Sequence, residues 1–228
     1  MSLERRLARE IAARLSRACE TRGRAALLVS GGRALVRLFE ELRTQVLDWS
    51  CVSIALADEC WVHPADPQSN ERIVRQVLLR KNAAAARFVG LKNAAPSPLL
   101  GAEAAWESLA SVPRPFDVTV LGMGDDGDTA SLLPGSPNLP KALDPSAAGA
   151  CVAMWARSAP HARLSLNLSA LLDSRQIWIL ISGEEKLRTY RAACSSDCVE
   201  EMPIRAILHQ ERTPVQVIWG AAAAAQVF

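Results

Sequence analysis

Glycines and carboxylates crowd the segment Gly122–Thr129, directly after the apolar run Phe116–Leu121. The glycines permit a tight turn, and the carboxylates of Asp125, Asp126 and Asp128 accompany them. Dinucleotide-binding turns use Gly-x-Gly-x-x-Gly, and this segment contains that pattern, but its carboxylates would repel a pyrophosphate. We therefore expect acid–base chemistry on a polar substrate here, ahead of simple turn capping.

A further carboxylate, Asp58, stands at the end of another apolar run, residues 52–57. In an open parallel sheet, ligands bind outside the carboxyl ends of the strands, which meet at one edge. The sequence therefore predicts that Asp58 lies near the carboxylates of Gly122–Thr129, where several titratable groups could act together.

A second glycine turn, Ser30-Gly31-Gly32, separates the apolar run Ala25–Val29 from a helical stretch. Backbone N–H groups and the dipole at a helix start attract anions, and glycine permits their close approach. Arg33 adds positive charge, and Arg163 and Lys186 stand near two further strand ends. The turn is also compatible with a plain connection, and each cation with a solvated surface. Together these residues predict a cationic cluster suited to a phosphate.

The three histidines occupy different settings: His63 in the loop after Asp58, His161 two residues before Arg163, and His209 without other chemistry nearby. Imidazole titrates near neutral pH, so the first two are candidate bases, although a lone loop histidine is more often a surface residue.

The six cysteines are scattered through the chain. The close pair Cys194-x-x-x-Cys198 has no second pair and no histidine at ligand spacing, so no metal site is expected. In a chain of this size the default expectation is reduced structural thiols.

Apolar runs of strand length alternate with amphipathic stretches along the chain. The expected strands are 25–29, 52–57, 87–90, 116–121, 164–168, 176–181 and 215–219. The expected helices are 3–22, the stretch ending at 43, 70–80, 102–111, 170–175, 184–193 and 203–208, with a long loop at 134–150. This alternation predicts an α/β fold with a mainly parallel, doubly wound sheet covered by helices on both faces.

The 228 residues are half hydrophobic and carry a formal net charge of +2, with 26 Lys and Arg against 24 Asp and Glu. We expect a single domain spanning residues 1–228. No basic excess points to nucleic acid, no signal peptide is recognisable, and no apolar run is long enough to span a membrane. A cytoplasmic protein is expected, and its oligomeric state is left open.

The motifs resemble those of the 6-phosphogluconolactonase family, within the glucosamine-6-phosphate isomerase/6-phosphogluconolactonase superfamily. The similarity extends through nearly the whole chain, and the string Gly-Met-Gly-x-Asp-Gly-x-Thr-Ala-Ser-Leu-x-Pro-Gly is quite specific. The matching blocks are Ser30–Gly32, Asp58–Val62, Ser69–Glu71, Phe116–Gly135, Arg163–Leu168, Gly183–Lys186 and Pro203–Arg205.

The resemblance implies a fold similar to that of glucosamine-6-phosphate deaminase. It implies hydrolysis of 6-phospho-D-glucono-1,5-lactone to 6-phosphogluconate in the oxidative pentose phosphate pathway, without a metal or an organic cofactor. It places the lactone ring beside Gly124, Gly127 and Asp58. It implies that the phosphate binds to Ser30, Gly31, Gly32, Arg163 and Lys186.

The sequence departs from the family pattern at three places. Asp128 stands where the family has the histidine assigned as general base, and Cys60 stands where it has an arginine. Ala34-Leu35 replaces a Thr-Pro pair beside the phosphate motif. An ordinary aspartate is a weaker base than histidine at neutral pH, but burial or neighbouring carboxylates would raise its pKa. We assign Asp128, with Asp58, Asp126 and His63, as the catalytic candidates.

Three functions follow from these residues. The first is an active lactonase with altered catalytic residues. The second is a relative that binds a phosphosugar or a protein partner without turnover. The third is a phosphosugar isomerase or deaminase on the same scaffold, which the lactonase-like motifs disfavour. The expected substrate is a small phosphosugar in every enzymatic case.

Overall fold

The computed structural model describes residues 1–155 and 160–220, with the side chain of Arg33 left out. Six strands form the main sheet in the order β4-β2-β1-β5-β8-β9, and every pairing in it is parallel. These strands are β1 (Ala25–Val29), β2 (Val52–Leu56), β4 (Arg87–Val89), β5 (Val118–Leu121), β8 (Ile177–Ser182) and β9 (Val215–Gly220). The central strands β1, β2 and β5 are buried along their whole length, as expected of parallel strands covered on both faces.

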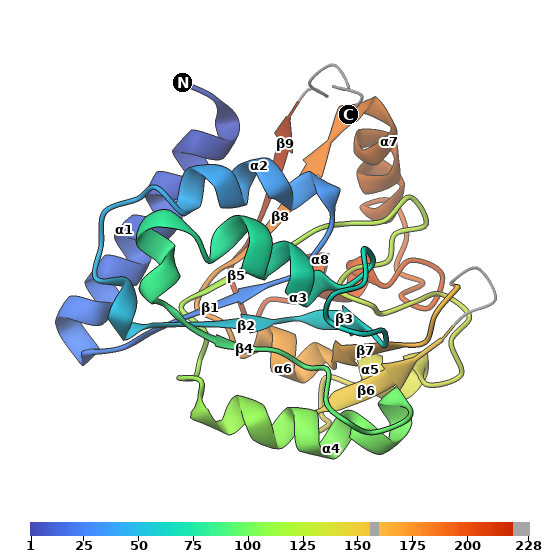
Figure 1. The fold of residues 1–228 in the computed structure, drawn as a ribbon. Coiled ribbons are helices and arrows are strands. Elements are labelled where there is room, and N and C mark those ends of the chain that lie inside the picture. The colour runs from blue at the N-terminus through green and yellow to red at the C-terminus, as the bar shows by residue number, and fades with distance from the viewer. Residues whose placement is uncertain (156–159, 221–228) are drawn as a thin grey trace.

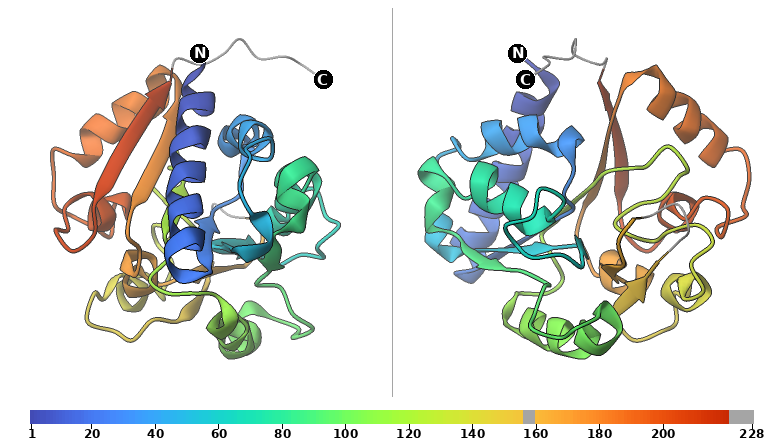
Figure 2. Two further views of the ribbon diagram at one scale, coloured as in Figure 1. Left: turned by 90° about the vertical axis from the view of Figure 1, so that its left-hand side faces the viewer. Right: turned by 45° about the vertical axis from the view of Figure 1, so that its right-hand side comes forward.

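Helices cover both faces of this sheet, which confirms the predicted doubly wound α/β class. Strands β8 and β9 lie between α7 on one side and α1 with α2 on the other (Figure 2, left). The helices are α1 (Leu3–Arg22), α2 (Arg33–Leu42), α3 (Asn70–Ile73), α4 (Pro98–Ser108), α5 (Leu139–Leu143), α6 (Leu168–Leu172), α7 (Gly183–Ala193) and α8 (Ile204–Leu208). Single turns of 3-10 or π-helix span Trp49–Cys51, Val74–Leu78, Lys81–Ala85 and Leu109–Ser111.

Helix α1 illustrates how the sequence dictates its element. Ser2 caps its start, because the serine side chain accepts a hydrogen bond from the backbone N–H of Arg5. Gly23 ends it in the left-handed conformation that favours glycine. Its apolar face, with Leu7, Ile11 and Leu15, is buried against the sheet and α2. No helix in residues 1–155 and 160–220 is both long and apolar enough to cross a bilayer.

A second, antiparallel sheet was not predicted from the sequence. Its strands are β3 (Asp58–Cys60), β7 (Arg163–Leu166) and β6 (Cys151–Met154), in the order β3-β7-β6. It lies beside the carboxyl ends of the main sheet, with α4 packed against it (Figure 1). Residues 58–60 are too few and too polar to show a strand pattern, and they pair with residues more than 100 positions away.

Two further expectations are corrected. The predicted loop at 134–150 contains the short helix α5, whose buried residues include Leu139 and Leu143. The cysteines are not all reduced, because Cys19 of α1 and Cys51 form a disulfide. Helix packing brings these two thiols together across 32 residues of chain, and their spacing in the sequence carried no indication of it.

Candidate functional site

A cavity of about 540 Å³ lies at the carboxyl edge of the main sheet. Strands β1, β5 and β8 each end at it and contribute their following turn, and β3 and β7 of the second sheet provide another wall. Its lining comprises Ser30, Gly31, Gly32, Ala34, Asp58, Asn70, Gly122, Met123, Gly124, Asp125, Asp128, Thr129, Ala130, Arg163, Ser182 and Lys186. The strand-end turns identified in the sequence therefore meet at one place, as the parallel topology requires.

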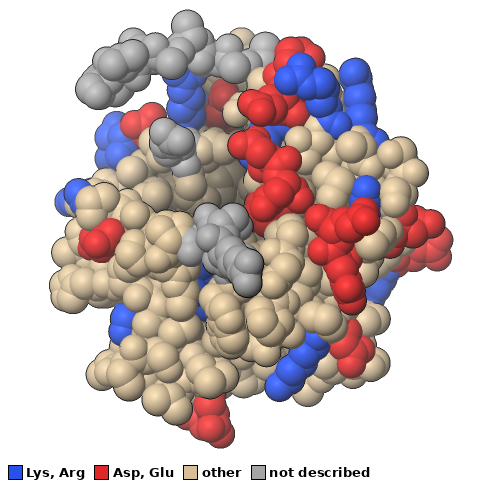
Figure 3. All heavy atoms as spheres, turned by 90° about the vertical axis from the view of Figure 1, so that its right-hand side faces the viewer, with Lys and Arg blue, Asp and Glu red and all other residues tan. Residues whose placement is uncertain are grey.

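The surface around this edge is hollowed. Figure 3 shows the side of the molecule on the right of Figure 1, and a recess lies there with Asp and Glu side chains along one border. Two cations, Arg163 and Lys186, line the cavity and contribute positive charge to it.

The turn after β1 forms one end of the cavity. The Oγ atom of Ser30 is buried and has no hydrogen-bond partner within the described part of the chain. Gly31 packs directly against Asn70, and a Cβ atom at position 31 would lie 1.9 Å from Asn70 Oδ1. Only glycine fits there, and its backbone together with the start of α2 faces the cavity. This end has the donors and the space for an anion.

Lys186 approaches the same region from the first turns of α7. Its Nζ atom lies 2.7 Å from Oδ1 of Asp125, which is well exposed to solvent. An ion pair with an exposed carboxylate is weak, so a bound phosphate could compete for this ammonium group.

Asp58 and Arg163 form a second group, joined by a residue that sequence reasoning did not single out. Ser131 donates a hydrogen bond from its hydroxyl to Asp58 Oδ2 at 2.6 Å and accepts one from Arg163 Nε at 2.6 Å. Arg163 Nη2 also lies 3.5 Å from Asp58 Oδ2. The other oxygen, Asp58 Oδ1, is buried without a hydrogen-bond partner among the described residues. It belongs to a residue that lines the cavity.

Charge dominates the environment of the guanidinium group of Arg163. Burial lowers its pKa, but the charge of Asp58, with a further contribution from Asp128, outweighs this and raises it. Arg163 therefore stays a cation at every accessible pH and is oriented by its partners.

The carboxyl group of Asp128 has a strongly shifted pKa. Burial, the nearby charge and hydrogen bond of Asp126, and the charge of Asp58 raise its pKa to about 7, against an opposing effect of Arg163. Its backbone N–H donates to Asp126 Oδ1 at 3.3 Å. Its own Oδ1 lies over Gly124, where a Cβ atom would come within 1.5 Å of it. A glycine at 124 thus leaves the room that this carboxyl occupies.

Cys60 lies behind the cavity instead of lining it. It is fully buried in β3, and its Sγ atom lies 3.8 Å from Arg163 Nη1. Burial raises the pKa of its thiol. The guanidinium group beside Asp58 therefore belongs to Arg163, and the uncharged thiol of Cys60 lies next to that group.

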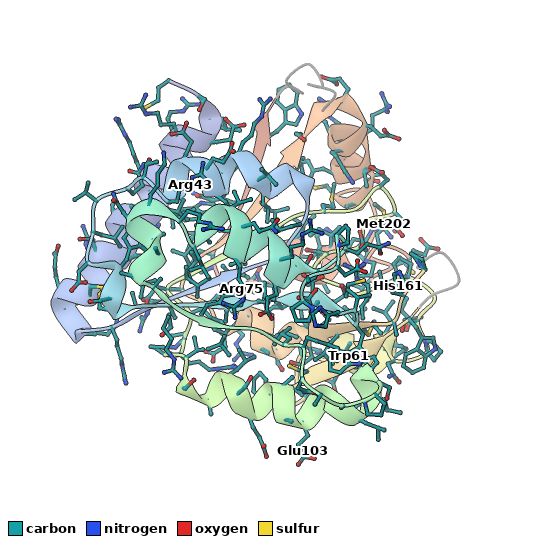
Figure 4. All side chains as sticks on the ribbon, in the orientation of Figure 1. Arg43, Trp61, Arg75, Glu103, His161 and Met202 are labelled. Carbon is teal, nitrogen blue, oxygen red and sulfur yellow. A yellow bond between two sulfur atoms is a disulfide. The ribbon has the colours of Figure 1, made fainter. Side chains whose placement is uncertain are left out.

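Several predicted residues do not line the cavity. Asp126 is exposed and contacts the site through Asp128. Gly127 holds the turn in a left-handed conformation, and its carbonyl accepts from Ile204 N–H while Met202 packs against it (Figure 4). His63 is exposed, with Nδ1 accepting a hydrogen bond from Ala65 N–H, and it is not among the lining residues. The side chain of Arg33 lies outside what the structure describes.

His161 is also absent from the cavity lining. It follows the segment 156–159, which lies outside the described residues, and it is exposed on the right-hand side of Figure 4. The structure therefore brings the carboxylates and cations together and leaves both candidate histidines outside.

Asn70 is a lining residue that sequence reasoning did not assign. Its Nδ2 donates to the carbonyl of Asp58 at 2.8 Å. Ser69 caps α3 by accepting a hydrogen bond from the backbone N–H of Arg72, which places Asn70 at the helix start. In the sequence, the serine at position 69 indicated that a helix begins there and that Asn70 is its first residue.

The fold and the site define an α/β protein in which a glycine turn, two cations and several carboxylates line a cavity at the carboxyl edge of a parallel sheet. The chain matches, over residues 1–219, the family of glucosamine-6-phosphate isomerases and 6-phosphogluconolactonases. This match covers most of the chain, which therefore belongs to that family.

Individual relatives point to one branch of the family. The 6-phosphogluconolactonase of Pseudomonas aeruginosa is 46% identical over 94% of this chain and 89% of its own. The 6-phosphogluconolactonase of Rhizobium meliloti is 41% identical over 96% of this chain and 94% of its own. A crystal structure of a 6-phosphogluconolactonase from Shewanella baltica is 50% identical, covers 96% of this chain and 93% of its own, and superimposes with a TM-score of 0.93.

A monomeric glucosamine-6-phosphate deaminase is 18% identical with a TM-score of 0.75, over 95% of this chain and 92% of its own. At that identity the likeness shows the shared fold alone. It confirms the predicted deaminase-like architecture without bearing on the reaction.

Proposed function

We propose that the protein hydrolyses 6-phospho-D-glucono-1,5-lactone to 6-phosphogluconate, the lactonase step of the oxidative pentose phosphate pathway. The relatives that are 46% and 41% identical over nearly the whole chain carry the 6-phosphogluconolactonase name. One structural observation gives the strongest support for a bound substrate. Two buried oxygen atoms without partners, Ser30 Oγ and Asp58 Oδ1, belong to residues that line the same cavity as Asp128.

The phosphate group is held at the β1 end of the cavity. Ser30 Oγ, the backbone N–H groups of the glycine turn and the start of α2 provide donors, and Lys186 provides charge once it leaves Asp125. This anchoring orients the rest of the sugar and supplies binding energy remote from the reacting carbon.

The lactone carbonyl carbon then lies between Asp128 and Arg163. Ionised Asp128 removes a proton from a water molecule as the water oxygen bonds to C1. The resemblance implied that Arg163 binds the phosphate, but its ion pair with Asp58 and its proximity to the charge of Asp128 favour a place at the reacting carbon. There Arg163 stabilises the negative charge that develops on the carbonyl oxygen, and Asp58 Oδ1 accepts a hydrogen bond from a ring hydroxyl. The bond between C1 and the ring oxygen breaks next, and protonated Asp128 returns its proton to that oxygen. The products are an acid and an alcohol on one chain.

A steady-state assay with the lactone tests this function, because the spontaneous hydrolysis of the lactone gives a built-in background. The wild type should accelerate the reaction far above that background. Asp128→Asn keeps the shape of the side chain but removes the base, so kcat should fall about a hundredfold or more. Asp128→His restores a group that titrates near neutral pH and should retain activity.

The same assay separates the alternatives. A wild type that gives no acceleration yet binds 6-phosphogluconate would favour the phosphosugar-binding relative without turnover. Full activity in Asp128→Asn would remove Asp128 from the mechanism and leave the lactonase activity intact, with Asp58 the next candidate. A cytoplasmic location and the action on a small phosphosugar, without nucleic acid, remain predictions.

A further inference from the structure

A second cavity, of about 400 Å³, lies at the opposite edge of the main sheet. Helix α1 runs along this edge, in front of the strands in the left panel of Figure 2. Four arginines and two carboxylates contribute to its lining, which comprises Glu10, Ala13, Arg14, Arg17, Ala18, Arg22, Asp117 and Arg175. None of these residues takes part in the proposed hydrolysis.

The carboxyl group of Asp117 organises half of this cluster. It is buried just before β5, and its Oδ2 accepts a hydrogen bond from Ala26 N–H at 2.9 Å. Its Oδ1 forms ion pairs with Arg22, at the end of α1, and with Arg175, before β8, the latter at 3.4 Å. One negative charge thus fixes two guanidinium groups at the wall of the cavity.

The other two arginines have no carboxylate partner in the described structure. Arg14 Nη2 donates to Gln176 Oε1 at 3.4 Å, and its guanidinium group lies 5.3 Å from the centre of the Trp178 ring. The Arg17 side chain makes no ion pair and no hydrogen bond with the described residues, and Glu10 pairs with none of their cations. Four arginines against Glu10 and Asp117 leave two positive charges in excess.

We propose that this cavity is a second anion site, which binds a small dianion carrying a phosphate group. Guanidinium groups present paired N–H donors that match phosphate oxygens, and two of the four are held in place by a buried carboxylate. A dianion neutralises the excess charge. The ion pairs of Asp117 hold Arg22 and Arg175 only. Arg14 contacts the neutral side chains of Gln176 and Trp178, so its charge, like that of Arg17, is not balanced by a carboxylate among the described residues.

The two sites are separate. Strand β5 joins them, since Asp117 precedes it and Gly122 follows it, and the five steps from residue 117 to residue 122 span roughly 16 Å at 3.3 Å per step. A ligand in the second cavity therefore contacts neither Asp128 nor Lys186, and this inference does not depend on the proposed hydrolysis.

Calorimetric titration with inorganic phosphate at low ionic strength tests the proposal. The wild type should bind phosphate at two sites, and Lys186→Ala should weaken the catalytic one and leave the other. In the Lys186→Ala background, Arg17→Gln should weaken the remaining site by about tenfold or more, because a charge-assisted contact is lost. Arg9→Gln is the matched control, because Arg9 is an exposed arginine of α1 outside the cavity lining.

Two results would overturn the proposal. One is a single phosphate site in the wild type that disappears with Lys186→Ala. The other is equal phosphate affinity of the Arg17→Gln and Arg9→Gln variants, both in the Lys186→Ala background. Arg14→Gln is a second variant that should repeat the Arg17 result, and circular dichroism establishes that each variant is folded. Lactone turnover by Arg17→Gln alone should equal that of the wild type, which separates this site from the catalytic one.

Discussion

Asp128 differs from an ordinary surface aspartate in three respects. It is largely buried, it lies beside Asp126 and Asp58, and the cation Arg163 opposes their influence on it. Burial disfavours its charged form and so do the neighbouring carboxylates, which is why its pKa rises to about 7. An aspartate in this environment can accept a proton near neutral pH, which is the task that the family resemblance implies for a histidine at this position.

The pH dependence of kcat/KM follows from this shift. Asp128 is protonated below its pKa and cannot act as a base there, so activity above the spontaneous rate should rise with pH through about 7. A profile measured from pH 5 to 9 checks this. An ordinary aspartate would place the inflection near 4, so a flat profile above pH 5 would contradict the shifted pKa.

Lys186 is expected to act on binding more than on the chemical step. It lies at the start of α7, close to the phosphate end of the cavity, and its present partner Asp125 is exposed. Lys186→Ala should raise KM about tenfold and change kcat little, because the lost contact is equal in the ground and transition states. Arg188→Ala, an exposed cation on the same helix, should leave both constants unchanged. A fall in kcat as large as the rise in KM would assign Lys186 to the reacting centre.

Helix α3 depends on one buried carboxyl group for its position. Glu59 accepts hydrogen bonds from the backbone N–H groups of Cys60, Asn70 and Glu71 and from the hydroxyl of Ser69. Burial raises its pKa to about 7, although these donors favour the ionised form. Glu59 thus joins β3 to the start of α3 and places Asn70 at the cavity.

Glu59→Gln should therefore destabilise the protein. One oxygen becomes an NH2 group that faces N–H donors, and leaving buried donors without an acceptor costs about 1–3 kcal/mol of unfolding free energy. Urea denaturation measures the change. Glu103→Gln, on the exposed face of α4 (Figure 4), is the control and should be within about 0.5 kcal/mol of the wild type. Equal stability of the two variants would show that Glu59 does not hold α3.

The fold places the two cavities described above at opposite edges of one sheet. The carboxyl edge collects the turns that follow β1, β5 and β8, while the amino edge collects arginines around Asp117. A ligand in the carboxyl-edge cavity would contact the ends of strands β1, β5 and β8 and also the second sheet. Its binding should therefore stabilise the folded state of the whole chain.

The product should therefore raise the melting temperature. A ligand present at a hundred times its dissociation constant adds about 2.7 kcal/mol to the unfolding free energy. A thermal scan with 6-phosphogluconate measures this. Arg163→Ala should reduce the shift, because it removes a cation from the cavity, whereas Arg9→Gln should not. A shift that is equal in Arg163→Ala and in the wild type would place the product elsewhere.

The sequence by itself determined the fold class, the family and the strand-end turns that build the site. These features are local: apolar runs, glycine turns and helix caps are encoded by residues that are close together in the chain. Ser30-Gly31-Gly32, Asp58 and Gly122–Thr129 could be identified for that reason, and the parallel topology brought them to one edge.

Only the tertiary structure decided which side chains work together. Ser131 meets Asp58 across 73 residues, the second sheet pairs Cys60 with Arg163, and Cys19 meets Cys51 through helix packing. The pKa of Asp128 also depends on burial, which no spacing reveals. Such contacts result from how elements pack, because a short motif records its own turn but not the distant residue that comes to lie against it.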